Sequence, residues 1–281
     1  VVFAIVPIII IIIMPVSLKT TVAGIPMKTC VYNASGPRTG ASAALAKINA
    51  SRSGAVLTKS ATLEKRSGNP LPRIWHDTET KGASLNSEGL PNSGIGYYVS
   101  KKTYEESMGE AKKKKPYIVS ISGHSLEENL KMIKITLQSD ILVDAIELNV
   151  ACPNIKDRPI VGYDMEQLRT MLARISANFP EFVLGFGRKV RFGLKLPPYF
   201  ESSKFDELAA VLNTYRVLVR YVVSTNTIGN ALAIDPISEM PCIKSNDGFA
   251  GLSGRALKYT ALANVKKLRE VLDPCIDVVG V

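Results

Sequence analysis

A cysteine lies between two asparagines in the segment ELNVACPN, residues 147–154. A thiol close to positively charged groups can lose its proton and act as a base or a nucleophile. Cys152 sits between Asn149 and Asn154, and Lys59 and Lys195 end segments of a similar apolar pattern and could supply the charge. Most free cysteines are nevertheless small buried apolar residues, so Cys152 alone does not identify a site.

Small or polar side chains end the first six apolar segments that we expect to be strands. Any one of them could cap a helix or form a turn, but six strand ends of one kind favour a binding site. They are Asn33, Ser35, Lys59, Ser60, Ser122, Gly123, Asn149, Cys152, Asn154, Lys195, Asn226 and Thr227. With Asn86, the amides among them suit a planar ring with amide-like edges, and the lysines suit anionic or electron-rich groups.

The elements that would position these residues alternate between strands and helices, which is typical of βαβ units and a parallel sheet. The predicted strands are 29–36, 54–62, 117–123, 145–154, 190–200, 217–227 and 275–281, and the predicted helices are 41–50, 126–138, 164–177, 204–214 and 259–272. Residues 63–110 should be an elaborated loop with little regular structure, and 228–258 a second insertion. The pattern predicts an α/β fold, a (β/α)8 TIM barrel whose strand ends converge on one mouth.

Composition narrows the chemistry. The chain has 281 residues, four cysteines without a C-x-x-C pair and only two histidines. We therefore expect no metal site and no disulfide framework, and any base should be a cysteine, lysine or carboxylate. The net charge of +10 favours anionic partners, but the run Lys112–Lys115 has no interleaved aromatic residues. It indicates a solvated helix end followed by Pro116 rather than a nucleic-acid surface.

The two ends of the chain differ from an ordinary barrel. Residues 1–16 carry no charge and include Pro7 and Pro15. This run is shorter than the roughly 20 residues of a membrane span and has no positive region of a signal peptide. We interpret 1–16 as an artefact or a leader, with a membrane anchor as the less favoured alternative, and 17–281 as the barrel. The chain stops at DVVGV, within a predicted strand.

Several ordered segments resemble dihydroorotate dehydrogenases of the soluble, cysteine-based class 1A. They are KSATLEKRSGNPLPR (59–73), LNSEGLPNSG (85–94), ELNVACPN (147–154), FGLKLPPYF (192–200), NTIGNALAID (226–235), DGFAGLSG (247–254) and TALANV (260–265). The resemblance implies an FMN-containing (β/α)8 barrel, usually a cytoplasmic homodimer that needs neither membrane nor nucleic acid. It also implies that the barrel is truncated here after its seventh strand, without strand 8. The cysteine separates this class from the membrane-bound, quinone-using class, which carries serine.

The resemblance further implies a reaction: (S)-dihydroorotate is oxidised to orotate in pyrimidine (UMP) biosynthesis, with hydride passing to FMN and electrons to fumarate. Cys152 would be the base. The substrate would be bound by Lys59, Asn86, Gly89, Leu90, Asn149, Asn154, Asn226 and Thr227. FMN would be bound by Ala34, Ser35, Lys59, Ser60, Asn149, Lys195, Thr225 and Gly254.

One departure bears on the substrate, because Glu88 stands where the family has methionine. A carboxylate there would repel an anionic substrate unless it turned outward or paired with Arg66 or Arg73. Two alternatives remain open. A tRNA-dihydrouridine synthase is also a cysteine-using flavin barrel, but it would need a basic docking domain for which no residues remain. An inactive fragment of the dehydrogenase, or a non-catalytic binding protein, is the other.

Overall fold

A parallel β-sheet organises the molecule. The computed structural model describes residues 16–79, 81–109, 115–151, 160–184 and 190–281. Within these ranges six strands form one parallel sheet in the order β12-β9-β8-β7-β6-β3, so that chain order runs steadily across it. The strands are β3 (Val56–Leu57), β6 (Tyr117–Ile121), β7 (Ala145–Asn149), β8 (Arg191–Lys195), β9 (Val219–Ser224) and β12 (Asp277–Gly280).

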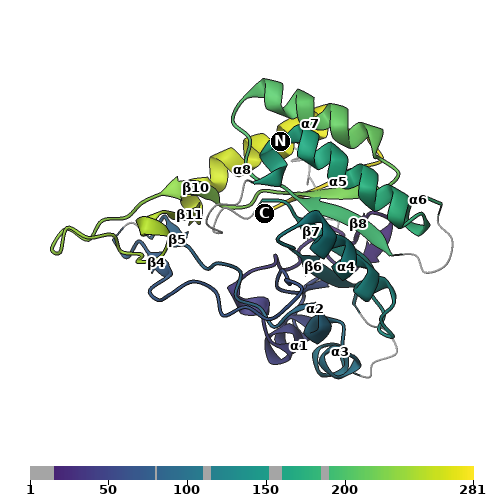
Figure 1. Cartoon of the computed structure of the whole chain (residues 1–281), viewed down its shortest axis with the longest axis horizontal. Helices are drawn as coiled ribbons and strands as arrows, with labels where there is room; N and C mark the ends of the chain where they lie inside the picture. The colour runs from purple at the N-terminus through teal and green to yellow at the C-terminus, as the bar shows by residue number, and fades with distance from the viewer. Residues whose placement is uncertain (1–15, 80, 110–114, 152–159, 185–189) are drawn as a thin grey trace, which may run out of the picture.

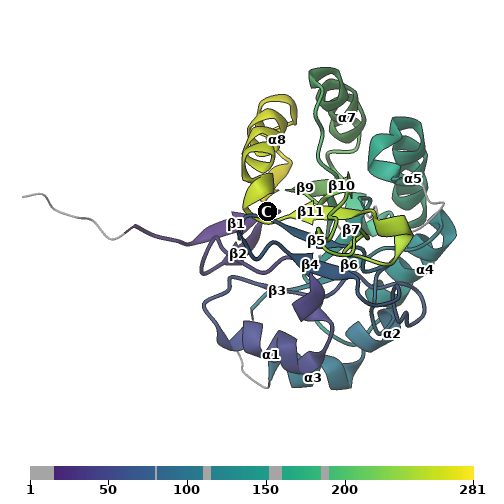
Figure 2. The same cartoon turned by 90° about the vertical axis from the view of Figure 1, so that its left-hand side faces the viewer.

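Helices cover the outer face of this sheet, and Figure 2 shows them as an arc around the strands. They are α1 (Ser42–Ala50), α2 (Ile95–Tyr98), α3 (Lys101–Met108), α4 (Leu126–Leu137), α5 (Met165–Asn178), α6 (Glu181–Leu184), α7 (Ser202–Thr214) and α8 (Lys258–Val271). Val119, Ile146, Leu194 and Val222 are completely buried in the core between the layers. The predicted barrel-type α/β fold is confirmed. No helix in the described ranges is long and apolar enough to cross a membrane.

The inner face of the sheet is closed at the amino ends of its strands by a short hairpin. Strands β1 (Thr20–Val22) and β2 (Ile25–Met27) pair antiparallel. Their apolar side chains pack with Leu57, Ile118 and Tyr221 of the parallel sheet. Asp277 Oδ2 accepts a hydrogen bond from the Ala23 N–H at 2.6 Å, which ties the hairpin to β12. The opposite end of the inner face, where the strands finish, is therefore the end left for a site.

A second, antiparallel sheet projects beside this end, and Figure 1 shows its strands together, away from the helical layer. Its order is β10-β11-β5-β4. The strands are β4 (Ile74–His76), β5 (Ser84–Asn86), β10 (Ile228–Ala231) and β11 (Ala250–Ser253). It joins the two segments that we expected to be separate insertions. The expectation of little regular structure in 63–110 is wrong, because β4, β5, α2 and α3 lie there.

The predicted strand at 29–36 is also wrong, whereas the other six predicted strands each contain a strand of the parallel sheet. The side chain of Asn33 explains the error. Its Oδ1 accepts from the Leu57 N–H at 3.0 Å and its Nδ2 donates to the Leu57 oxygen at 2.7 Å. The Asn33 side-chain amide thus makes the two hydrogen bonds to the Leu57 backbone that a neighbouring strand would otherwise make. The expected helix end at Lys112–Lys115 falls mostly on residues outside the described ranges, and α3 already ends at Met108.

Candidate functional site

A cavity of about 860 Å³ lies at the carboxyl ends of the parallel strands, between them and the antiparallel sheet. Its volume is within the range of small-molecule sites, roughly 300–1,000 Å³. Of the residues that we predicted to bind substrate or cofactor, those that line it are Ala34, Ser35, Lys59, Ser60, Asn86, Gly89, Leu90, Asn149, Lys195, Thr225, Asn226, Thr227 and Gly254. The two remaining predicted residues, Cys152 and Asn154, lie outside the described residues.

One edge of the cavity holds an ion pair. The Lys59 ammonium donates to Glu88 Oε2 at 2.8 Å, and only 7% of the Lys59 side chain and 12% of the Glu88 side chain are exposed. Glu88 therefore neither turns outward nor pairs with Arg66 or Arg73, the two ways considered above in which it would not repel an anionic substrate. Arg66 instead contacts His124 and donates to the Gly89 oxygen, and Arg73 donates to the Ser67 and Asn69 oxygens.

Two asparagine amides meet across the cavity wall. Asn149 ends β7, Asn226 follows β9, and the Asn226 Nδ2 donates to Asn149 Oδ1 at 3.2 Å. The same Oδ1 accepts from the Ala151 N–H at 3.1 Å, and Asn226 Oδ1 accepts from the Thr227 N–H at 2.9 Å. These bonds orient both amide planes before any ligand binds. They also hold the backbone directly before Cys152.

Three hydroxyls connect the amides to the far wall. Ser60 Oγ lies 3.0 Å from Ser35 Oγ and 2.9 Å from Ser120 Oγ, and Asn149 Nδ2 donates to it at 3.5 Å. Ser60 and Ser120 are buried and stand on neighbouring segments of the parallel sheet. Hydroxyls both donate and accept hydrogen bonds, so these three serines can pair with either a donor or an acceptor atom of a ligand.

A second lysine lies deeper, against the inner face of the sheet. Lys195 is the last residue of β8 and is only 6% exposed. Burial lowers the pKa of Lys195, the Glu147 carboxylate opposes that shift, and the Lys59 charge adds to it. Burial raises the pKa of Glu147 to about 7, and Lys195 opposes this shift. The charge of each group thus opposes the shift that burial imposes on the pKa of the other.

Glu147 is unusual because neither of its oxygens accepts a hydrogen bond from a residue in the described ranges. The hydroxyls of Tyr32 and Tyr221 are equally buried and likewise have no partner among the described residues. Burial, followed by the Glu147 charge, raises the pKa of both tyrosines above the ordinary value. Gly193 makes this arrangement possible, since a Cβ there would collide with the Tyr221 ring.

Some cavity residues escaped the sequence prediction. His76 comes from β4, in the segment that we had expected to be irregular. Arg255 lies between β11 and α8, and Lys258 is the first residue of α8. A signal for the two cations was present, because basic residues directly after Gly254 and before a predicted helix are an anion-binding cue. No comparable signal marks His76 as a cavity residue.

Comparisons with known proteins identify the family of this chain. The family model described as dihydroorotate dehydrogenase matches residues 17–281. The chain is 40% identical over 265 residues to dihydroorotate dehydrogenase A (fumarate) of Lactococcus lactis subsp. cremoris, covering 94% of this chain and 79% of the relative. It is 38% identical over 255 residues to dihydroorotate dehydrogenase (fumarate) of Trypanosoma brucei brucei, covering 89% and 74%.

A solved structure supports the fold alone. The dihydroorotate dehydrogenase of Eimeria tenella, determined in complex with ferulenol, matches with a TM-score of 0.72 at 17% identity, over 93% of this chain and 72% of that one. The family match covers nearly the whole chain, and both sequence relatives are of the fumarate type. This chain belongs to the dihydroorotate dehydrogenase family of oxidoreductases.

Proposed function

We propose that this protein oxidises (S)-dihydroorotate to orotate in pyrimidine biosynthesis, with FMN as cofactor and fumarate as the final electron acceptor. The observation that carries the proposal is the hydrogen-bonded pair Asn149–Asn226, which lines the same cavity as two buried lysines, Lys59 and Lys195. Paired amides match the alternating donor and acceptor edge of a dihydropyrimidine ring. The fumarate in the names of the Lactococcus and Trypanosoma relatives supports the choice of acceptor.

The residues around the cavity fit a flavin. The cavity combines a buried lysine, a row of hydroxyls and a backbone that can approach closely at Gly254, whose φ of +89° favours glycine. Ala34, Ser35, Ser60, Lys195, Thr225 and Gly254 would hold FMN, with Lys59 and Asn149 shared with the substrate. When bound, FMN supplies the acceptor for the substrate hydride and passes two electrons to fumarate. Lys195 would place positive charge beside the ring as it gains electrons.

The remaining roles belong to this chain's own side chains. Cys152 would take a proton from C5 of dihydroorotate as hydride leaves C6, so that the C5–C6 double bond of orotate forms. Lys59 and the backbone of Gly89 and Leu90 would bind the carboxylate. Asn86, Asn149, Asn154, Asn226 and Thr227 would bind the amide-like edges. Asn149 has a second task, since its Oδ1 also accepts from the Ala151 N–H and steadies the backbone leading to Cys152.

Anaerobic reduction of the FMN-loaded protein tests the proposal. Dihydroorotate should bleach the visible flavin absorption, fumarate should restore it, and orotate should form in equal amount. Cys152→Ala should slow the bleaching by roughly 10²–10⁴-fold, because a general base typically contributes that much, equal to about 3–5 kcal/mol of barrier. Cys242→Ala is the matched control, since Cys242 does not line the cavity. A flavin that dihydroorotate leaves oxidised would exclude the proposed reaction.

A further inference from the structure

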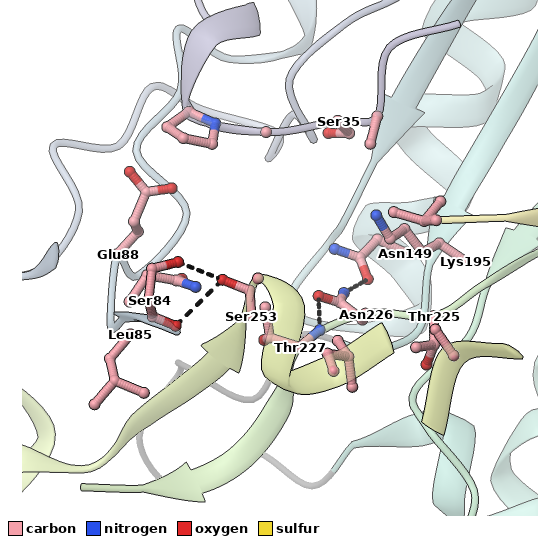
Figure 3. Close-up of a pocket in the computed structure, with 18 of the residues that line it drawn as sticks. Ser35, Ser84, Leu85, Glu88, Asn149, Lys195, Thr225, Asn226, Thr227 and Ser253 are labelled. Carbon is pink, nitrogen blue, oxygen red and sulfur yellow. Dashed lines mark hydrogen bonds between the residues drawn. The ribbon is translucent and has the colours of Figure 1, made fainter. Parts of the chain in front are cut away.

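Glu88 enters the cavity from the loop that follows β5. Figure 3 shows it across the opening from Asn149 and Lys195. Its carboxylate accepts from the Lys59 ammonium at 2.8 Å, and both side chains are largely withdrawn from water. Lys59 is also the lysine expected to hold a substrate carboxylate. The chain's own carboxylate therefore already occupies the cation that an acidic ligand would need.

The backbone around Glu88 keeps the side chain in that direction. Its carbonyl oxygen accepts from the Asn69 N–H at 2.8 Å. The next two residues, Gly89 and Leu90, have φ values of +67° and +57°. A Cβ at Gly89 would collide with the Asn69 side chain, so few sequences could follow this path. The backbone conformation of this turn thus directs the Glu88 side chain into the cavity, where it contacts Lys59.

The other charged groups that line the cavity do not duplicate Lys59. Lys195 faces Glu147 at the inner end and is already influenced by that carboxylate. Arg255 comes from the segment between β11 and α8, Lys258 is the first residue of α8, and His76 comes from β4. The Lys59 charge is offset by the Glu88 carboxylate that it contacts. A ligand carboxylate placed there meets one positive and one negative group at close range, and the Coulomb terms oppose each other.

We propose that Glu88 is a specificity-determining residue that reduces the preference of this site for a carboxylated pyrimidine over the neutral ring. A neutral 2,4-dioxopyrimidine can use the amide pair and leave the Lys59–Glu88 contact intact. A ring that bears a carboxylate has to displace Glu88 from Lys59 or bind beside it. This inference rests on the proposed function for the placement of the ring. It makes Glu88 a determinant of KM for dihydroorotate and leaves kcat to the residues at the reacting carbons.

Equilibrium binding of orotate and of uracil to the FMN-loaded protein, followed by perturbation of the flavin spectrum, tests the inference. In the wild type the two dissociation constants should lie within about tenfold of each other. Glu88→Gln and Glu88→Met should tighten orotate at least about tenfold, the size expected when one charge-assisted contact is released. Uracil affinity should stay within about twofold. In turnover, the same variants should lower KM for dihydroorotate with kcat unchanged.

Glu64→Gln is the matched control, because it removes an exposed carboxylate from the same long loop without touching the cavity. It should leave both affinities as they are. The wild-type ratio needs no variant to fold, so a wild type that binds orotate several hundred-fold more tightly than uracil overturns the inference. Glu88 variants that fold, turn over dihydroorotate and bind orotate like the wild type overturn it as well. A protein that binds neither ring in any form refutes both this inference and the proposed function.

Discussion

The two buried lysines of the cavity have very different surroundings. Lys59, at the mouth, bonds directly to Glu88, whose position depends on an irregular loop. Lys195, at the inner end, faces Glu147 from the neighbouring strand, and the Glu147 oxygens receive no hydrogen bond from the described residues. Lys59 thus has a hydrogen-bonded partner, whereas the carboxylate that faces Lys195 has a pKa raised by burial to about 7. The mouth is thus suited to selecting ligands, and the inner end to responding to charge in a bound ring.

The largest expected effect is on stability, because the buried Glu147 carboxyl should make the free energy of unfolding depend on pH. The folded-state pKa of Glu147 is about 7, above its ordinary value of 4.5. Between these values the unfolded chain loses the proton while the folded chain keeps it, so stability falls as pH rises from 4.5 to 7 and the loss is complete above 7. The shift corresponds to about 3 kcal/mol. Urea unfolding at pH 5 and pH 8 measures it.

Glu147→Gln provides the comparison for that experiment. Gln cannot ionise, so the variant should lack this part of the pH dependence and gain on the wild type as pH rises. Equal slopes for the two proteins would contradict the assigned pKa shift. They would also remove the contrast between the two lysines.

A smaller effect is expected at the mouth. Lys59→Met should lower the free energy of unfolding by roughly 1–3 kcal/mol, because it leaves the Glu88 carboxylate without its bonded partner in a largely buried place. The double variant Lys59→Met with Glu88→Met should recover much of that loss, since the uncompensated charge is removed. Denaturant unfolding of the three proteins at pH 7 gives both values. Additive losses in the double variant would show that the two residues do not act as a pair.

The smallest effect belongs to an exposed pair of similar geometry. Lys204 donates to Glu207 at 2.7 Å on α7, but nearly half of each side chain is in water. Solvent and salt screen such pairs, so Lys204→Met should leave the unfolding midpoint unchanged within error. The two ion pairs have similar lengths, so a larger loss of stability in Lys59→Met than in Lys204→Met would show that burial, and not bond length, determines their contribution. A midpoint shift as large as that of Lys59→Met would contradict this reasoning.

Local patterns predicted most of the scaffold. The helix predicted at 126–138 is present as α4, and at its start Ser125 Oγ accepts from the Glu128 N–H at 3.1 Å. The short helix at 101–108 was missed, although Ser100 caps it in the same way. Its neighbourhood is rich in glycine, proline and asparagine, and that composition outweighed the cap signal.

The amino-acid sequence alone determined the alternation of strands and helices and the polar residues at the strand ends, because side-chain periodicity and capping act over a few neighbouring residues. It also carried the family motifs that point to the cavity. Only the tertiary structure decided which charges meet. Lys59 and Glu88 are far apart in the chain, as are the two segments that form the antiparallel sheet. Contacts of that kind depend on the loop path and on burial, and local sequence patterns do not show that Glu88 contacts Lys59.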